Sequence, residues 1–370
     1  MKKVLFITRP ISPPWDEASK NFAFFLAKNL ADKLDFTLLT KGHVEELPEK
    51  VTQLPIYTSN EMSMSLWQKA KILKVAKKRD EFDLIHFMLT PAKLNSLGFK
   101  FFFGKGKAKT VQTVATLRED LFSENDFKKI LFADRIVTYS DYAKDKLQEM
   151  GFDNVTRIYP GIDIERYTPQ SKDAQTMEHF GIKESDFVIT YPGEYVRLGA
   201  TDDLVSIIPE LVEQIPNLKF VFANRVKNEK DARKKEEAVE KLERVGMLGH
   251  VVFTDTFSDM PKIYNMSDII LFPVQNMHGK FDVPLAVIEA FASAKPVIIS
   301  DLPVLSEFAS NNNSVIIPKG DKAALCREIF SLEKDAGRRE RIGSAACAFA
   351  RENFNISDVA AKYENLYLNL

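Results

Sequence analysis

Short apolar runs alternate with amphipathic helical segments along nearly the whole chain, and this alternation is the strongest limit on its fold. The run VLFIT at 4–8 is followed by a stretch at 21–34 whose apolar residues recur every three or four positions. Further runs rich in β-branched or aromatic residues read DFTLLT, DLIHFM, TVQTVA and ADRIVTYS. Strands of this kind that alternate with helices predict parallel sheets covered on both faces. The chain is therefore predicted to be α/β.

The alternation breaks once, between residues 160 and 185, where a polar segment with two prolines indicates an interdomain connection. It restarts at FVITYPGE and continues through KFVFANR, HVVFTDTF, DIILFPV, KPVIISD and SVIIPKG. A chain of 370 residues also exceeds one ordinary core, which favours two domains. We predict two doubly wound, Rossmann-like domains that face each other across a cleft. Ligands should bind beyond the carboxyl ends of the strands.

Composition and cysteine usage are those of a globular cytoplasmic protein. Hydrophobic residues make up 45% and charged residues 28% of the chain. The opening MKKVLFITRP predicts a buried first strand rather than a signal peptide, because its apolar run is short and no small-residue cleavage site follows. No apolar run approaches the roughly 20 residues needed to cross a bilayer. Cys326 and Cys347 lack metal-ligand spacing and fit a reducing cytosol.

Several common catalytic motifs are absent from the sequence. No G-x-G-x-x-G follows the first strand, no Walker A loop or G-x-S-x-G elbow occurs, and no two aspartates stand two positions apart. The five histidines do not pair at metal-binding spacing. These absences leave open an enzyme without metal or other cofactor that holds its ligand by hydrogen bonds. No nucleic-acid partner is expected.

Glu289 is the most informative single residue. The strand SDIILFPV leads through a loop into a helix that begins near Leu285, and KPVIISD forms the next strand. Unpaired N–H groups and the macrodipole at such a helix N-terminus favour phosphate. Glu289 lies one turn inside on an otherwise apolar face, where a carboxylate is costly without strong hydrogen bonds. The hydroxyl pair of a ribose would supply them; a backbone cap or an arginine partner is the alternative.

The segment FDVPLAVIEAFASAKPVIISD resembles the donor-binding signature of the family 4 retaining glycosyltransferases, which have the GT-B fold. That signature has two glutamates eight positions apart, followed by a pattern of alanines and small residues that ends in Pro-Val. Other segments resemble the family in order and spacing: ADRIVTYSDYAKDKL, IYPGIDIERYTP, FTDTFSDMPKIYNMSDIILFP and VIIPKGDKAAL. The signature positions that match are Glu289, Ala290, Ala292, Ala294, Pro296 and Val297.

The resemblance implies transfer of a sugar, with retention and without a metal, from a nucleoside diphosphate sugar to a glycan, lipid-linked or cell-envelope acceptor. Glu289 would then bind the donor ribose, and the amides around Leu285 and Ala286 would face the diphosphate. Gly193 matches the glycine whose backbone approaches the donor. The leaving diphosphate would act as the base, so groups that stabilise its charge would carry most of the catalysis.

The sequence diverges from the family in the donor motif. The first glutamate of the pair falls at Phe281, and the adjacent Asp282 is our candidate to replace it at the sugar and in catalysis. An arginine and a lysine that usually follow the glycine fall at Glu194 and Gly199. Arg197, the nearest cation, is the candidate to hold the diphosphate and to act in catalysis; a surface arginine is the alternative.

These departures, together with Ala115 where the family often has a histidine, support a second hypothesis. The chain would then be a non-catalytic GT-B homologue that serves as a binding or scaffold subunit.

Acceptor contacts are expected in the first domain. The loop after the first strand contributes Asp16, Glu17 and Lys20, and Arg118 follows a later strand, where a loop salt bridge is the alternative. Residues 1–170 carry 27 lysines and arginines against 22 aspartates and glutamates. This excess favours an anionic acceptor or an anionic membrane surface on the inner face of the plasma membrane, although a solvated helix face is the simpler reading. The helix SLWQKAKILKVAKKRDEF fits a membrane surface or an ordinary core-facing helix.

The expected domains are an N-terminal acceptor-binding domain over 1–165 and a C-terminal donor-binding domain over 166–350. A terminal helix at 351–370 is expected to pack back on the N-terminal domain.

Overall fold

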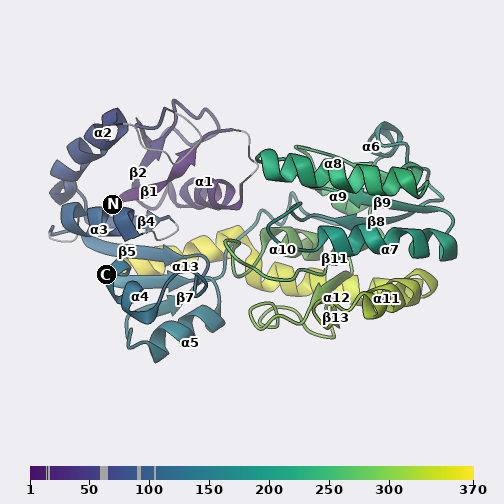
Figure 1. Cartoon of the computed structure of the whole chain (residues 1–370). Coiled ribbons are helices and arrows are strands. Elements are labelled where there is room, and N and C mark those ends of the chain that lie inside the picture. The colour runs from purple at the N-terminus through teal and green to yellow at the C-terminus, as the bar shows by residue number, and fades with distance from the viewer. Residues whose placement is uncertain (14, 16, 59–65, 90–92, 104–105) are drawn as a thin grey trace. The chain divides into compact units, whose positions relative to one another are not determined.

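A computed structural model describes the chain except for residues 14, 16, 59–65, 90–92 and 104–105 (Figure 1). The chain forms two compact units. Unit 1 comprises Met1–Ile162, Gly279–Asp282 and Phe354–Leu370, and unit 2 comprises Asp163–His278 and Val283–Asn353. The sequence placed the divisions at 165/166 and 350/351. It did not anticipate that the short segment Gly279–Asp282 belongs with the first unit.

Unit 1 contains a parallel sheet of seven strands in the order β3-β2-β1-β4-β5-β6-β7. The strand order reverses between β1 and β4. Alternate residues of β1 face opposite layers: Val4 and Phe6 join one core cluster, while Leu5 and Ile7 join another. A strand buried on both faces must be apolar throughout, which explains the continuous run at 4–8. The strands are β1 (Lys3–Ile11), β2 (Asp35–Thr40), β3 (Thr52–Pro55), β4 (Leu84–Met88), β5 (Lys109–Val114), β6 (Arg135–Thr138) and β7 (Val155–Arg157).

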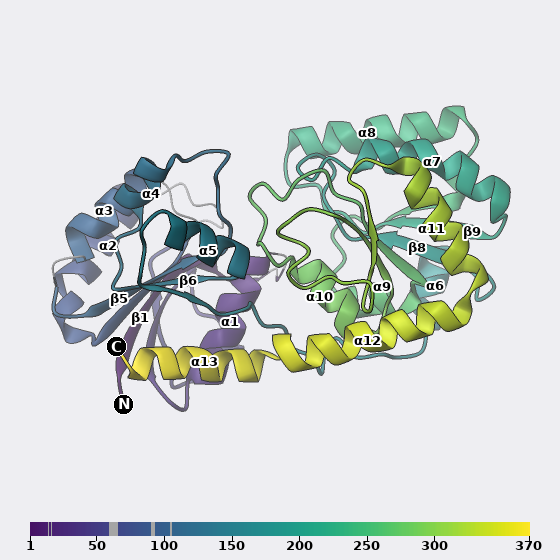
Figure 2. The same cartoon turned by 90° about the horizontal axis from the view of Figure 1, so that it is seen from below.

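Helices cover both faces of this sheet. One layer contains α1 and the terminal helix α13, which pack against each other (Figure 2). The other layer contains α2 and α3, whose Ile72 and Phe103 are buried against β1 and β4. The helices of unit 1 are α1 (Ala18–Leu30), α2 (Leu66–Lys77), α3 (Lys93–Phe103), α4 (Glu124–Ile130), α5 (Asp141–Glu149) and α13 (Ile356–Leu368), with a 3-10 turn at Arg79–Glu81.

A buried histidine ties α13 to the sheet. Nδ1 of His86 on β4 lies 2.6 Å from the Tyr367 hydroxyl, and its Nε2 lies 2.7 Å from Oγ1 of Thr113 on β5. Burial lowers the pKa of His86 to about 3, so the ring is neutral at physiological pH. The residue therefore has a structural role in joining the last helix to unit 1.

Unit 2 contains a parallel sheet of six strands in the order β10-β9-β8-β11-β12-β13. The order reverses between β8 and β11, as it does between β1 and β4, so both sheets are doubly wound and the predicted fold class is confirmed. The strands are β8 (Phe187–Tyr191), β9 (Leu218–Phe222), β10 (Val251–Phe253), β11 (Ile269–Phe272), β12 (Val297–Ser300) and β13 (Val315–Ile317). The helices are α6 (Ala174–His179), α7 (Thr201–Gln214), α8 (Glu229–Arg244), α9 (Met260–Met266), α10 (Leu285–Ala292), α11 (Lys322–Lys334) and α12 (Ala336–Phe354), with a 3-10 turn at Leu248–His250.

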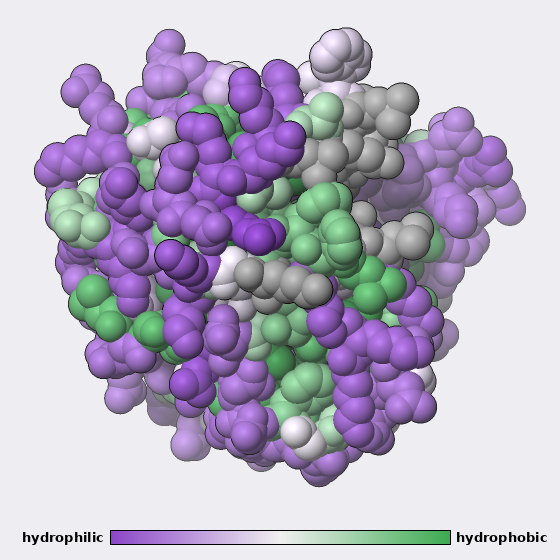
Figure 3. Space-filling model, turned by 90° about the vertical axis from the view of Figure 1, so that its left-hand side faces the viewer, coloured by the Kyte–Doolittle hydropathy of each residue, from purple (hydrophilic) through white to green (hydrophobic). Residues whose placement is uncertain are grey.

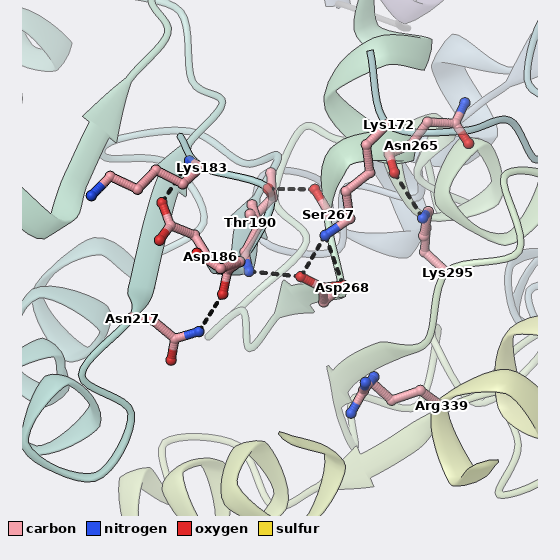
Figure 4. Close-up of polar contacts among 12 residues, drawn as sticks. Lys172, Lys183, Asp186, Thr190, Asn217, Asn265, Ser267, Asp268, Lys295 and Arg339 are labelled. Atoms are coloured by element: carbon pink, nitrogen blue, oxygen red, sulfur yellow. Dashed lines mark hydrogen bonds and ion pairs between the residues drawn. The ribbon is translucent and has the colours of Figure 1, made fainter. Parts of the chain in front are cut away.

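Salt bridges and backbone hydrogen bonds close the amino edge of the second sheet (Figure 4). The carboxylate of Asp268, just before β11, accepts the Val188 N–H of β8 at 2.8 Å and both its oxygens lie 3.0 Å from Lys172 Nζ. Nearby, Lys295 Nζ donates to the Asn265 carbonyl at 3.0 Å. Burial lowers the pKa of Lys295 to about 8. These contacts connect α9, β8, β11 and the start of β12 along one edge of the sheet.

A left-handed residue ends α10 at this same edge. Ala294 has φ 54°, a conformation that costs a residue with a Cβ roughly 1–2 kcal/mol. Gly343 of α12 packs directly on it, since a Cβ at position 343 would lie 2.2 Å from the Ala294 carbonyl oxygen. The strained turn is thus held in place by close helix packing. Among the helices described in full or in part, none combines the length and apolarity that a membrane span requires.

Candidate functional site

Doubly wound sheets bind ligands beyond the carboxyl ends of their strands, so the carboxyl edge of the second sheet is the candidate site. Strand order reverses between β8 and β11, and loops that leave such neighbours in opposite directions open a crevice at their ends. The Gln275 N–H, after β11, donates to the Leu198 carbonyl, after β8, at 2.8 Å. The two loops are therefore fixed to each other at the reversal point.

Gly193 follows β8, and its backbone lies against the side chain of Tyr191, the last residue of that strand. A Cβ at this position would lie 1.9 Å from Cζ of Tyr191, so the conformation is open only to glycine. The Gly193 N–H donates to Oδ1 of Asn224, after β9, at 2.9 Å. Asn224 is fully buried, and its Nδ2 has no hydrogen-bond partner within the described part of the chain. An unpaired buried donor costs about 1–3 kcal/mol, which marks it as a candidate ligand contact.

Two cations meet on one buried carboxylate beside Gly193. The Glu194 side chain is 6% exposed, and its Oε2 lies 3.2 Å from Nε of Arg197. Its Oε1 pairs with Nζ of Lys227, which comes from the loop after β9. The three groups carry a formal charge of +1. Glu194, which stands where the family usually has an arginine, thus holds Arg197 and Lys227 beside the carboxyl ends of β8 and β9.

Sequence reasoning selected Arg197 but missed Lys227. Lys227 has no counterpart in the motif, and only its place shortly after the KFVFANR strand could have indicated it. Because carboxyl ends of neighbouring parallel strands share one edge, residues after β9 lie beside those after β8.

Glu289 lies in the middle of α10, whose N-cap position is Pro284, without a side-chain cap. The Tyr264 hydroxyl of α9 donates to Glu289 Oε2 at 2.9 Å, and Tyr167 provides a second side-chain hydrogen bond. Burial raises the pKa of Glu289, while the two tyrosines and the charge of Arg166 act in the opposite direction. The partners of the carboxylate are thus tyrosine hydroxyls, and neither the predicted backbone cap nor an arginine ion pair is found among the described contacts.

The first turn of α10 contains Leu285, which is buried, and Ala286, which is partly exposed. The N-cap is Pro284 and gives no side-chain cap, so the Leu285 and Ala286 amides have no partner among the described residues and can face a ligand or water. The next amide, of Val287, donates to the Pro284 carbonyl at 3.0 Å. Gly193 and Arg197 thus follow β8, Leu285 and Ala286 form the first turn of α10, and Glu289 lies one turn further along the same helix. All five belong to unit 2.

Asp282 belongs to unit 1. Its carboxylate is buried, accepts the Ser140 hydroxyl at 2.8 Å, and lies 3.4 Å from the Leu117 N–H. Its own N–H donates to the Ala115 carbonyl at 2.9 Å. Phe281 packs edge-on against Tyr139, with ring centroids 5.0 Å apart. The predicted role of Asp282 at the donor sugar stays a prediction; within unit 1 the carboxylate anchors its segment at the ends of β5 and β6.

The acceptor candidates of unit 1 have partners within the chain. Glu17 forms an ion pair with Arg9 at 3.0 Å, and the buried Lys20 donates to the Ser12 carbonyl at 3.4 Å. Arg118 makes two 2.7 Å bonds to Asp120, which is the predicted loop salt bridge. Asp16 lies outside the described residues. A role in acceptor binding stays a prediction for all four candidates, which are Asp16, Glu17, Lys20 and Arg118.

Known families match both parts of the chain. Residues 173–348 match the family described as "Glycosyl transferases group 1", and residues 20–166 match "Glycosyltransferase Family 4". The D-inositol 3-phosphate glycosyltransferase of Streptomyces bingchenggensis is 24% identical over 310 residues, 81% of this chain and 64% of that protein. The capsular polysaccharide biosynthesis glycosyltransferase CapM of Staphylococcus aureus is 23% identical over 272 residues, 73% and 66% of the two chains.

The fold has solved counterparts. Anabaena Alr3699/HepE, solved in complex with UDP, is similar over the whole of both chains with a TM-score of 0.79 and 17% sequence identity. It was also solved with UDP-glucose, where the TM-score is 0.77. These similarities define the GT-B class of α/β proteins.

The chain belongs to glycosyltransferase family 4, as its resemblance in the donor motif indicated. It spans about two thirds of the length of the curated relatives above, at 64% and 66%.

Proposed function

We propose that this chain transfers a sugar from a nucleoside diphosphate sugar to a glycan, lipid-linked or cell-envelope acceptor, with retention and without a metal or other cofactor. The observation that carries the proposal is Glu289, a carboxylate held by tyrosines on the unit 2 helix that begins at the carboxyl edge. HepE, which shares the fold, was solved with UDP and with UDP-glucose. The proposal therefore places the nucleotide on unit 2.

In this proposal Glu289 accepts hydrogen bonds from the ribose hydroxyls. The Gly193 turn lets the donor approach the backbone, and the Asn224 Nδ2 donates to it. The first amides of α10, at Leu285 and Ala286, face the diphosphate, where the helix dipole favours negative charge.

Arg197 and Lys227 supply positive charge to the same diphosphate. Glu194 holds both cations in place before the ligand arrives, which lowers the cost of organising them. As the bond from the anomeric carbon to the diphosphate oxygen breaks, negative charge grows on that oxygen and these cations stabilise it. The acceptor oxygen bonds to the same face of the sugar, and its proton passes to the leaving diphosphate. Asp282 is assigned to the sugar hydroxyls in place of the missing glutamate at Phe281.

Calorimetry with UDP, GDP and ADP, followed by donor hydrolysis with the matching nucleotide sugars, tests this function. We expect binding of one nucleoside diphosphate that Glu289→Gln weakens strongly and that the surface variant Glu213→Gln leaves unchanged. Analysis of the product anomer by NMR tests retention. An inverted product, or loss of activity in EDTA, would contradict the mechanism.

A second candidate is a non-catalytic binding or scaffold subunit. It is favoured by the loss of the usual family residues at three places, which are Phe281, Glu194/Gly199 and Ala115. Absence of nucleotide binding, with a normally folded protein, would support this candidate. Nucleotide binding without hydrolysis or transfer from any sugar nucleotide would support a nucleotide-binding subunit.

We also propose that the protein works in the cytoplasm at the inner face of the plasma membrane. The basic excess of residues 1–170 supports an anionic or membrane-borne acceptor. Transfer to extracted lipid-linked acceptors, compared with soluble glycans, tests this assignment.

A further inference from the structure

Unit 1 exposes large apolar side chains on two adjacent helices, α2 and α3. Trp67 is 80% exposed, Phe101 is 70% exposed and Leu97 is 48% exposed. Figure 3 views the side of unit 1 on which these helices lie and shows apolar side chains gathered among hydrophilic ones. We call this the α2–α3 surface, which comprises Trp67, Lys71, Lys74, Leu97, Lys100, Phe101 and Phe102.

These exposed residues are not displaced core residues. The inner sides of the two helices are packed, with Ile72, Ala76 and Phe103 all buried in the core cluster that includes Leu5 and Ile85. The helical repeat of 3.6 residues therefore puts a second, outward stripe on each helix. An outward Trp and Phe cost free energy in water, which makes this surface a candidate for contact with another apolar phase.

The outward stripes combine apolar groups with lysines at helical spacing. Trp67, Lys71 and Lys74 lie four and three positions apart on α2, and all three are exposed. On α3, Leu97 and Phe101 lie four positions apart with Lys100 beside them. The pattern is that of a helix that lies in a bilayer interface, with aromatic rings in the acyl boundary and ammonium groups at the headgroups.

The charge on these helices has one sign. The sequences LWQKAKILKVAK and KLNSLGFKFFF contain six lysines and neither aspartate nor glutamate. Acidic groups begin at the following 3-10 turn, where Asp80 faces Arg79, and Lys93 at the start of α3 pairs with Asp126 of α4. The lysines on the outward stripes have no acidic partner among the described residues; Lys71 donates to the Pro55 carbonyl at 3.4 Å, which leaves its charge uncompensated. The charges of Lys71, Lys74 and Lys100 can therefore face negative headgroups.

We propose that the α2–α3 surface docks unit 1 on an anionic lipid bilayer, with Trp67, Leu97 and Phe101 inserted and Lys71, Lys74 and Lys100 at the headgroups. The charge of these helices argues for the occupant. Two helices that carry lysines and no aspartate or glutamate fit a negative surface better than a second copy of themselves, which would bring like charges together. The proposal deepens the proposed function, because docking would hold the acceptor-binding unit at its lipid-borne substrate.

Co-sedimentation with vesicles measures docking without any donor or acceptor. The full chain is compared on vesicles of phosphatidylcholine alone and with phosphatidylglycerol at about one third. Trp67→Ala/Phe101→Ala removes the inserting rings, and Lys71→Glu/Lys74→Glu reverses two charges. The matched controls are Leu121→Ala/Val245→Ala, two other exposed apolar side chains, and Lys129→Glu/Lys362→Glu, two exposed lysines elsewhere on unit 1.

We expect binding to the anionic vesicles that each test variant lowers at least tenfold and each control leaves within about twofold. A basic residue near an anionic surface contributes about 1 kcal/mol, or about fivefold, so two charge reversals exceed the tenfold threshold. Salt at 0.5 M should weaken the charge contribution and spare the apolar one.

Equal binding to neutral vesicles, or equal binding by test variants and controls, would overturn the proposal. So would self-association without vesicle binding that Trp67→Ala/Phe101→Ala abolishes, since a second copy would then occupy the surface. Nucleotide calorimetry on the same variants keeps the two proposals apart. Vesicle binding by a chain that binds no nucleotide would defeat the proposed function and leave the docking surface standing.

Discussion

The two edges of the second sheet differ in whether their buried polar groups have hydrogen-bond partners. At the amino edge the carboxylate of Asp268 receives a backbone N–H and a lysine. At the carboxyl edge Asn224 and Ser300, which follow β9 and end β12, each keep a buried polar atom without a hydrogen-bond partner among the described residues. At the amino edge only the Ser293 hydroxyl, which follows α10, is likewise buried without a partner among the described residues. The charged groups of the amino edge are thus paired, whereas the carboxyl edge keeps an amide and a hydroxyl with open hydrogen-bonding capacity.

This difference indicates which edge contributes to the free energy of unfolding and which contributes to the free energy of ligand binding. A satisfied ion pair and its backbone hydrogen bond contribute to folding in the absence of any ligand. An unpaired buried group lowers stability until a ligand pairs with it, and that recovered free energy then appears as binding. Substitutions at the two edges should therefore change different measured quantities.

The largest expected effect concerns Glu289. Because hydrogen bonds to a charged group contribute about 1.5–3 kcal/mol, we expect Glu289→Gln to weaken nucleoside diphosphate binding by roughly 10- to 100-fold. The free energy of unfolding should fall little or rise, since the substitution removes a charge whose burial is unfavourable. Calorimetry and urea unfolding measure the two quantities. A loss of stability with unchanged nucleotide affinity would show that Glu289 has a structural role, as Asp268 does, and does not bind the ligand.

Asp268→Ala should give the converse result. The variant leaves Lys172 and the Val188 N–H without their carboxylate, and we expect a loss of about 2 kcal/mol in the free energy of unfolding. Affinity of the remaining folded protein for the nucleotide should be unchanged. Unfolding in urea, with calorimetry well below the transition, checks both. A tenfold weaker affinity would show that the edges are coupled.

The two cations at the carboxyl edge should have effects of intermediate size. We expect Lys227→Ala and Arg197→Ala each to weaken diphosphate binding about tenfold, and to leave binding of the uncharged nucleoside unchanged. Arg233→Ala, at a side chain of α8 that is 75% exposed, is the matched control. The effect should shrink as salt rises. If only Arg197→Ala weakens diphosphate binding, Lys227 holds Glu194 in place and does not contact the ligand.

Ala294→Gly should stabilise the protein. Glycine adopts the left-handed conformation at φ 54° without strain, so we expect a gain of about 1 kcal/mol in the free energy of unfolding. Ala290→Gly, inside α10, is the control of opposite sign, because glycine in a helix costs about 1 kcal/mol. Thermal unfolding of both variants measures the difference. Nucleotide affinity should stay constant in Ala294→Gly, since the residue ends α10 away from its first turn.

The smallest effect is a proton linked to nucleotide binding. Burial raises the pKa of Glu289 in the free protein, so the folded state holds this proton more tightly than the unfolded state. The carboxyl therefore adds stability as pH falls through the range between its raised pKa and its ordinary value. Ribose hydroxyls favour the ionised form, so binding should weaken over the same fall in pH and should release less than one proton. Calorimetry in buffers of different ionisation enthalpy measures the release, and Glu289→Gln should abolish it.

Much of this molecule could be predicted from its sequence. Buried parallel strands are apolar on both faces, so continuous apolar runs such as 4–8 and 187–191 can be recognised as strands in the sequence. The alternation of these runs with helices predicts the α/β class. The position of Glu289 on a helix after a strand also follows from local pattern. Glycine at 193 is required locally, because the chain turns against Tyr191 two residues earlier.

The tertiary structure decided what these residues touch. Glu289 meets Tyr264 and Tyr167 because α9 and the segment before α6 pack beside α10, and no periodicity in the sequence specifies that packing. Glu194 meets Lys227 because β8 and β9 are neighbours, and Asp282 joins unit 1 through Ser140, 142 positions earlier. Local pattern sets secondary structure through interactions within a few residues, whereas charge pairs and hydrogen bonds depend on which distant strands and helices become neighbours.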